Sequence, residues 1–323
     1  MSANNALTAQ KQKFSAAIST ETYRNLINNT LGDPERSRRF VASITSAVAV
    51  NPALQDCAPS TILAGALLGE SLNLSPSPQL GQYYLVPFEN KLKDKEGKTL
   101  WVMDEEGKHV LDKSGKWLAM TEKKAQFVLG FKGYIQLAIR SGQYKDIDAI
   151  EIKEGEYLGK DPDTGKPRFS FIEDDDERDA RPVIGYLAYF EYLNGFKKSL
   201  YWSKTKMMNH ADEYSPAFSA QAFVKLEKGE IPQEELWKYS SFWYKNFDEM
   251  AKKTMLRQIL SKWGMMSIEL QQAYVHDSQF IQMNESGSFV GDYEDPIPAE
   301  TPTVEQNKEA EQGEPQKVSL NDL

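Results

Sequence analysis

The chain has 323 residues, of which 40% are hydrophobic, so it can build one large domain or two modest ones around a sizeable core. A single cysteine, Cys57, excludes an internal disulfide, and the lack of any run of about 18 apolar residues argues against a membrane span. A net charge of −9 would argue against a nucleic-acid partner, but the charge is unevenly distributed. Residues 291–323 hold nine acids and two lysines, so the preceding 290 residues have a net charge of only −2.

The first 78 residues are predicted to be mostly helical. Residues 8–31 have one helical pattern, and a second helix is expected at Asp33-Pro34, where Asp caps and Pro suits the first helical position. This helix is predicted to stop before Asn51-Pro52, and a third helix covers residues 59–74. We therefore predict a helical N-terminal lobe over residues 1–78.

Strand and turn patterns follow. Residues 81–89 are strand-like, and Asp-x-x-Gly-Lys sequences then recur at 94–98, 104–108 and 112–116. Glycine supplies the positive φ that such turns need, so the repeats predict a small β-meander. Residues 125–131 are expected to form a central strand.

A helix is predicted after the central strand, ending at Ser141-Gly142. Residues 144–152 and 183–203 are predicted strands, the latter folded at the hairpin turn Asn194-Gly195. Helices over 204–214 and 240–263 complete the pattern.

From about residue 285 the chain is rich in Pro, Glu and Gln, a composition typical of disorder. The fold class is therefore α+β, with a small antiparallel sheet and hairpin core packed with helices and a disordered acidic C-terminal tail. The predicted units are the helical lobe (1–78), a core of β-sheet and helices (79–270), and a C-terminal segment with the tail (271–323).

Local charge points to a polyanion. Residues 121–145 hold five bases against one acid. At 100° per residue, one narrow helical stripe collects two cations and two amides without an acid: Lys132, Gln136, Arg140 and Gln143. Such a stripe suits phosphate oxygens. The alternative is an ordinary solvated face. Lys123 and Lys124 lie close by in sequence, with a solvated turn as their alternative.

The helix predicted over 240–263 is also basic. Its cations are Lys245, Lys252, Lys253, Arg257 and Lys262. Pairing at i,i+4 with Asp248 and Glu249 could neutralise Lys252 and Lys253, whereas Arg257 has no acid three or four residues away. Arg257 is therefore the strongest phosphate candidate of this helix.

Aromatic residues lie among the cations of the helix predicted over 240–263 and of a second basic segment at 197–206. Trp243, Tyr244 and Phe247 could stack on bases or, as is more usual, belong to the core. The segment "KKSLYWSKTK" interleaves Tyr201 and Trp202 with four lysines: Lys197, Lys198, Lys204 and Lys206. This mixture fits a groove for single-stranded nucleic acid, with a lysine-protected strand edge as the alternative.

Enzymatic motifs are weak. "EGKT" at 96–99 lacks the glycine that a phosphate-binding loop requires five residues before Gly97, and the three histidines lack cysteine partners at metal spacing. Cys57 is expected in the core. The Glu-x-Lys of "IEIK" at 150–153 is typical of metal-dependent nucleases, and the acids at 173–176 could hold Mg²⁺ or be merely solvated.

Four long segments, taken in order, resemble phage RecT-like single-strand annealing recombinases, the RecT/Redβ family. They are "NPALQDCAPSTILAGALLGESLNLSP", "GQYYLVPF", "AQFVLGFKGYIQLAIRSGQY" and "FDEMAKKTMLRQILSKW". The resemblance covers roughly residues 50–265. The meander at 90–120 is longer than the lysine-rich loop common in the family.

The resemblance implies ATP-independent binding and annealing of single-stranded DNA by a ring or helical filament, with a core similar to eukaryotic strand-annealing proteins. It implies oligomer contacts by the N-terminal lobe, DNA binding by the core over residues 79–270, and partner binding by the C-terminal segment over residues 271–323. It implies no catalytic site, and no cofactor beyond Mg²⁺ as a DNA counterion. Implied partners are single-stranded DNA, the annealed duplex, further copies of the chain, a phage 5′→3′ exonuclease and the host single-stranded-DNA-binding protein.

By motif, the resemblance assigns DNA contacts to Lys132, Gln136, Arg140, Lys253 and Arg257. Together with the basic patches, the predicted contacts are Lys123, Lys124, Lys132, Gln136, Arg140, Gln143, Lys198, Lys204, Lys206, Lys245, Lys253 and Arg257. The start of the chain lacks the apolar core of a signal peptide, so a bacterial cytoplasmic location and no membrane partner are expected. A passive single-stranded-DNA-binding protein and a metal-dependent nuclease remain the alternatives.

Overall fold

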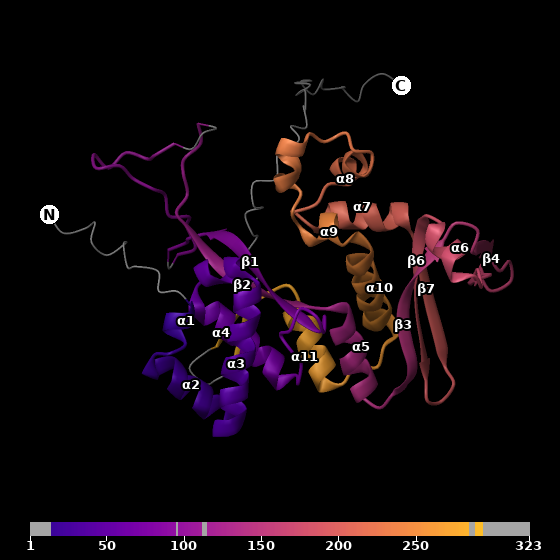
Figure 1. The fold of residues 1–323 in the computed structure, drawn as a ribbon, viewed down its shortest axis with the longest axis horizontal. Coiled ribbons are helices and arrows are strands. Elements are labelled where there is room, and N and C mark those ends of the chain that lie inside the picture. The colour runs from indigo at the N-terminus through magenta and orange to yellow at the C-terminus, as the bar shows by residue number, and fades with distance from the viewer. Residues whose placement is uncertain (1–13, 95, 112–114, 284–287, 293–323) are drawn as a thin grey trace, which may run out of the picture.

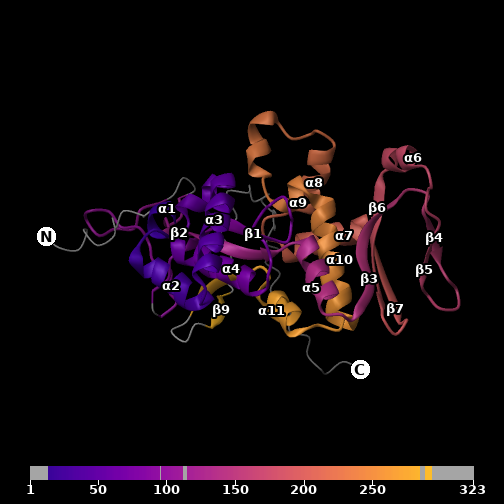
Figure 2. The same cartoon turned by 60° about the horizontal axis from the view of Figure 1, so that its bottom comes forward.

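The computed structural model describes residues 14–94, 96–111, 115–283 and 288–292 (Figure 1). A helical lobe and a long β-hairpin occupy one end of the molecule, and a three-stranded sheet occupies the other, together with a flap formed by residues 157–180. Helices lie between them and above the sheet. The same arrangement is seen from a second direction (Figure 2). The predicted mixture of helices with small antiparallel sheets is confirmed.

The N-terminal lobe contains α1 (Phe14–Ala17), α2 (Glu21–Leu31), α3 (Pro34–Val50), the 3₁₀ turn η1 (Pro52–Asp56) and α4 (Pro59–Ser71). The single helix predicted over 8–31 is wrong within its described part, because Thr20 adopts extended backbone between α1 and α2. Residues 8–13 lie outside the described residues.

The predicted start of α3 is confirmed in detail. Asp33 caps the helix by accepting a hydrogen bond from the Glu35 amide at 2.8 Å, with Pro34 in the first turn. α4 ends at Ser71, earlier than the predicted residue 74, and Asn73 has a φ of +51°, which a continuing helix cannot contain.

β1 (Tyr83–Lys91) and β2 (Thr121–Leu129) pair antiparallel, with Tyr83 opposite Leu129. The strand predicted over 125–131 is confirmed for residues 125–129, but its position at the centre of a sheet is wrong, because the β1-β2 sheet has two strands and α5 begins at Phe131. A single further bridge joins Phe127 to Gln279. α4 covers this hairpin and is buried around most of its circumference.

The described residues between 92 and 120 extend the hairpin outward as an arm (Figure 1). Isolated bridges such as Met103 to His109 and Leu111 to Trp117 join its limbs. Gly97 and Gly107 have φ values of +81° and +77° at the turns, which confirms the predicted turn chemistry there. Residues 112–114 of the third turn lie outside the described residues.

The second sheet has the order β3-β6-β7 and is antiparallel throughout. Its strands are β3 (Tyr144–Lys153), β6 (Val183–Tyr192) and β7 (Lys197–Ser203). The predicted turn at Asn194-Gly195 is confirmed, with Gly195 at a φ of +85°. A short hairpin and a helix, which the sequence pattern did not predict, lie at this end: β4 (Tyr157–Lys160), β5 (Pro167–Phe169) and α6 (Asp175–Ala180).

Two helices pack on one face of this sheet, α5 (Phe131–Arg140) and α10 (Phe247–Trp263). The helix predicted over 240–263 is broken at Asn246, whose φ and ψ of −139° and 54° are not helical. The helical segments before the break are α7 (Lys204–Tyr214), α8 (Ala220–Glu227), η2 (Gln233–Lys238) and α9 (Phe242–Lys245).

After α10 come α11 (Ile268–His276), β8 (Phe280–Met283) and β9 (Phe289–Asp292). Disorder from about residue 285 is therefore wrong for residues 289–292, which pair with β8. The acidic tail from residue 293 lies outside the described residues. β8 lies against α4, so the two ends of the described chain share one core. The unit limits at 78/79 and 270/271 stay predictions.

Within the described ranges, no helix combines the length and the apolar character needed to cross a membrane.

Candidate nucleic-acid interface

Two glycines fix the position of α5. A Cβ on Gly133 would lie 2.0 Å from the carbonyl oxygen of Gln82, and one on Gly130 would lie 2.1 Å from that of Gly81. Only glycine permits so close an approach of backbone to backbone. The helix is therefore held against the start of β1, with Tyr134, Leu137 and Ala138 buried.

The stripe predicted on α5 faces outward at both ends. Lys132 and Arg140 are exposed, Gln136 is partly buried, and Gln143 is exposed beyond Gly142. Arg140 also donates from Nη1 to the carbonyl oxygen of Leu72 at 3.0 Å, which ties the end of α5 to the end of α4. A helical rise of 1.5 Å per residue puts Lys132 and Arg140 about 12 Å apart along the axis. Neither cation forms an ion pair with a residue that the structure describes.

The cations of α10 lie in a different environment. Lys253 Nζ lies 3.0 Å from Asp277 Oδ1, and Arg257 Nη1 lies 2.7 Å from Asp277 Oδ2. The Lys253 side chain is 9% exposed and that of Arg257 is 34% exposed. The Arg257 guanidinium also lies 4.4 Å from the ring centroid of Tyr274. Of the two, Arg257 alone presents appreciable surface to solvent.

Asp277 directly follows α11 and contacts three further elements, β2, α5 and α10. Its Oδ1 accepts from the Leu129 amide of β2 at 2.9 Å, and its Oδ2 accepts from the Tyr134 hydroxyl of α5 at 2.9 Å. Together with the two cations of α10, these groups form a cluster, called here the Asp277 node: Leu129, Tyr134, Lys253, Arg257 and Asp277. The node holds two formal positive charges and one negative charge.

The electrostatics of the node follow from burial. Removal from water raises the pKa of the Asp277 carboxyl, but the charges of Lys253 and Arg257 and the hydrogen bonds from Lys253 and Leu129 outweigh this and lower it below its usual value. Asp277 is therefore ionised at neutral pH and compensates one of the two α10 cations. Its role could not be predicted from the sequence, because it is a lone acid 20 residues after Arg257.

The i,i+4 pairs predicted in α10 are wrong. Lys252 pairs with Glu249 at 2.6 Å, one turn back at i,i+3, and with Glu151 of β3 at 3.6 Å. Asp248 instead accepts the Tyr186 hydroxyl. These charges are therefore satisfied partly within the helix, by Glu249, and partly by residues of β3 and β6.

The aromatic residues of this region divide in an unexpected way. Trp243, Tyr244 and Phe247 are buried, so of the two alternatives the core is confirmed. Phe242, which was not among the predicted residues, is 42% exposed, and its ring centroid lies 5.9 Å from that of Tyr84. The sequence contains a signal for this difference. At 100° per residue, Trp243, Tyr244 and Phe247 share one side of a helix, and Phe242 lies away from that side.

Other predicted contacts are scattered. Lys123 lies 3.3 Å from Asp56, and Lys204 pairs with Glu227 at 2.7 Å. Lys198 lies 4.4 Å from the Trp263 ring centroid and Lys206 lies 4.5 Å from that of Trp202, which is itself buried. Lys245 is exposed on α9.

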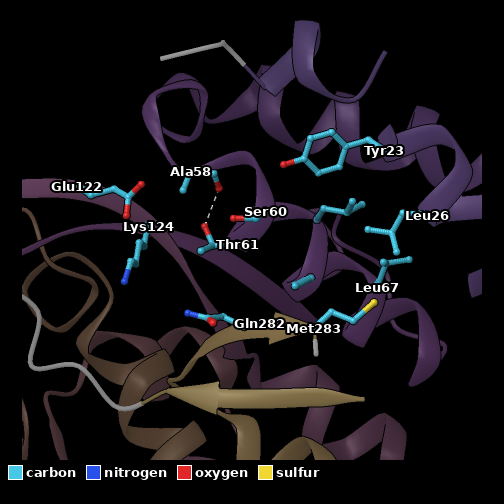
Figure 3. Close-up of a pocket in the computed structure, with 12 residues that line it drawn as sticks. Tyr23, Leu26, Ala58, Ser60, Thr61, Leu67, Glu122, Lys124, Gln282 and Met283 are labelled. Carbon is cyan, nitrogen blue, oxygen red and sulfur yellow. Dashed lines mark hydrogen bonds between the residues drawn. The ribbon is translucent and has the colours of Figure 1, made fainter. Parts of the chain in front are cut away.

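Lys124 lines an open depression of about 370 Å³ where α2, α4, β2 and β8 meet (Figure 3). Thr61 lies beside it and accepts a hydrogen bond from the Ala125 amide at 2.9 Å. Gln282 and Met283 close another side. The lining is mixed in polarity, and the depression marks where the lobe meets the hairpin.

The structure adds little support for a metal-dependent nuclease. Glu151 lies 3.4 Å from Lys153 and is shared with Lys252. The acids at 173–176 begin α6, where Asp174 caps the helix by accepting from Glu177. Among the residues that the structure describes, no three His, Cys, Asp or Glu side chains are grouped to hold a metal ion.

The family model described as "RecT family" matches residues 38–290, a range that contains both α5 and α10. The chain is 32% identical over 245 residues to the uncharacterized protein YqaK of Bacillus subtilis (strain 168), which covers 76% of this chain and 66% of that protein. It is 24% identical over 269 residues to Protein RecT of Escherichia coli (strain K12), covering 80% and 78% respectively.

Proposed function

The chain belongs to the RecT family, and on that premise we propose that it binds single-stranded DNA and anneals it to a complementary strand without ATP. Membership of the family supports a role in single-strand annealing during recombination. Proteins of this family are annealing proteins rather than enzymes. The observation that carries the proposal is the match over residues 38–290, which spans the exposed stripe of α5 and the whole Asp277 node.

The proposed DNA contacts begin with the stripe of α5. Lys132 and Arg140 are exposed cations without described acidic partners, and Gln136 lies between them. Phosphate contacts of this kind position a strand without reading its sequence. Arg257 contributes through its exposed part, and Lys253 acts indirectly by holding Asp277 and with it α10 against α5.

The physical task is modest, which fits a protein without bond-breaking chemistry. Two strands repel each other through their phosphates, and a cationic surface lowers that repulsion. A protein that contacts mainly the backbone leaves base edges free to test for a complement. Stacking then supplies roughly 1.4 kcal/mol per base-pair step, so pairing itself drives the reaction.

Assembly and partners are part of the proposal. A ring or helical filament of this chain would join many weak phosphate contacts into one binding surface and make binding strongly salt-dependent. The N-terminal lobe would supply the contacts between copies. A phage 5′→3′ exonuclease, the host single-stranded-DNA-binding protein and a bacterial cytoplasm complete the setting, with Mg²⁺ acting only as a counterion.

The test is fluorescence-monitored annealing of two complementary oligonucleotides without ATP, at two salt concentrations. We expect the wild type to accelerate pairing and the acceleration to fall at the higher salt concentration. Binding without acceleration would make the chain a passive single-stranded-DNA-binding protein. Loss of labelled DNA that depends on Mg²⁺ would instead support the nuclease.

A further inference from the structure

Two aromatic rings meet at the surface between β1 and α9. The ring centroids of Tyr84 and Phe242 are 5.9 Å apart, with the planes at 41°. Phe242 is 42% exposed, and Tyr84 is partly buried. The pair joins segments that are far apart in sequence, so the tertiary fold alone brings it together.

Exposed cations flank the pair. A Cβ placed on Gly81 would lie 3.2 Å from the Tyr84 hydroxyl oxygen and 3.5 Å from Lys132 Cδ, so both side chains lie against the same glycine. On the other side, Lys245 follows Phe242 by three residues in α9, which makes the two neighbours on the helix surface. Both lysines are exposed and have no ion-pair partner within the described ranges.

One acid lies close to the pair and is neutralised locally. Burial raises the pKa of the Tyr84 hydroxyl, and the negative charge of nearby Glu249 raises it further. Glu249 is held by Lys252 at 2.6 Å, and Lys252 lies 5.6 Å from the ring centroid of Phe131. The surface therefore keeps a net positive character.

This order of groups has the chemistry of a nucleotide-binding surface. An exposed aromatic ring offers a π face to any base, and an ammonium group on each side offers a partner to the flanking phosphates. Stacking is indifferent to base identity because every base has a π face. It also leaves the hydrogen-bonding edge of the base open, as annealing requires.

We infer that Tyr84 and Phe242 form an aromatic platform on which a base of single-stranded DNA stacks, between phosphates held by Lys132 and Lys245. The inference rests on the proposed function and deepens it, since it assigns base contacts to two residues outside the predicted set. It also replaces the buried rings of Trp243, Tyr244 and Phe247 as the stacking surface.

The experiment compares two labelled probes of equal length, an oligothymidylate and an abasic oligonucleotide with the same phosphates. Anisotropy titrations of the full chain at fixed salt give both affinities. We expect the wild type to bind the oligothymidylate roughly tenfold more tightly, and Phe242→Ala to abolish this difference while its affinity for the abasic probe stays unchanged. Phe242→Trp should restore the difference.

Two further variants guard the result. Phe242→Leu keeps apolar volume without a ring, so it should lose the same preference even if Phe242→Ala is poorly folded. Phe171→Ala removes a ring that is 49% exposed, at the flap end of the molecule, and should bind as the wild type does.

The failures are distinguishable. A wild type that binds both probes equally, or a Phe242→Leu variant that keeps the full preference, overturns the platform and leaves DNA binding in place. A wild type that binds neither probe overturns the proposed function, and the platform with it.

Discussion

Helices α5 and α10 pack against each other, and each carries cations that the sequence analysis predicts as DNA contacts. In α5, Lys132 and Arg140 remain at the surface. In α10, Lys253 is withdrawn to 9% exposure beside Asp277, and Arg257 shares the same carboxylate. Helical periodicity therefore tells which residues share a face, whereas the neighbours of that face decide whether the charge meets solvent or a buried partner.

The two helices also differ in what a lost charge should do. A buried ion pair adds little net stability, because desolvation offsets the attraction, but a buried charge left alone is strongly destabilising. An exposed cation has no such penalty. Mutations in α10 should therefore act on folding, and mutations in the α5 stripe should act on DNA binding.

The largest effect is expected from Asp277→Ala. The change leaves Lys253 buried and uncompensated and removes the acceptor for the Leu129 amide, so we expect the free energy of unfolding to fall by about 3–5 kcal/mol. Urea unfolding measures it. Asp179→Ala, an exposed acid of α6, is the control and should stay within about 0.5 kcal/mol of the wild type. A similar small change for Asp277→Ala would contradict the node.

The next effect separates stability from binding within α10. Lys253→Met keeps the apolar stem and leaves Asp277 with Arg257, Tyr134 and the Leu129 amide, so the expected loss of stability is about 1.5–3 kcal/mol. The affinity of the folded protein for single-stranded DNA should not change. A large drop in affinity without loss of fold would make Lys253 a direct DNA contact.

The reverse pattern is expected for Lys132→Ala combined with Arg140→Ala. Removing two phosphate contacts to a single strand should make the negative slope of log affinity against log salt less steep by about 1.4. Loss of the hydrogen bond to Leu72 should lower the free energy of unfolding by about 1 kcal/mol. Salt titrations of oligonucleotide binding measure the slope. Lys160→Ala and Lys166→Ala, exposed at the flap end, form the matched control pair.

The smallest expected effect is a loss of folding stability at acidic pH. Since the pKa of Asp277 is lowered in the folded state, its stabilisation is present above the ordinary carboxyl pKa and is lost as pH falls through the folded value. Urea unfolding from pH ~5 downward should show the wild type losing up to about 1.4 kcal/mol per pH unit more than Asp277→Asn. Parallel curves would remove Asp277 as the titrating group.

Much of the fold could be predicted from local signals. The Asp33 cap, the glycine turns of the arm and the Asn194-Gly195 hairpin depend on backbone geometry that a few adjacent residues determine. The misjudged features depend on distant parts of the chain. Asn246 breaks a pattern that is helical on both sides, and β9 pairs with β8 although it lies in the segment predicted to be disordered.

The family and the stripe on α5 can be read from the sequence alone, because a long ordered set of motifs and a helical period are properties of the chain. The surroundings of each side chain depend on the folded molecule. It took Lys253 to Asp277 and placed Phe242 against Tyr84, because burial and charge compensation depend on segments that meet only when the chain is folded.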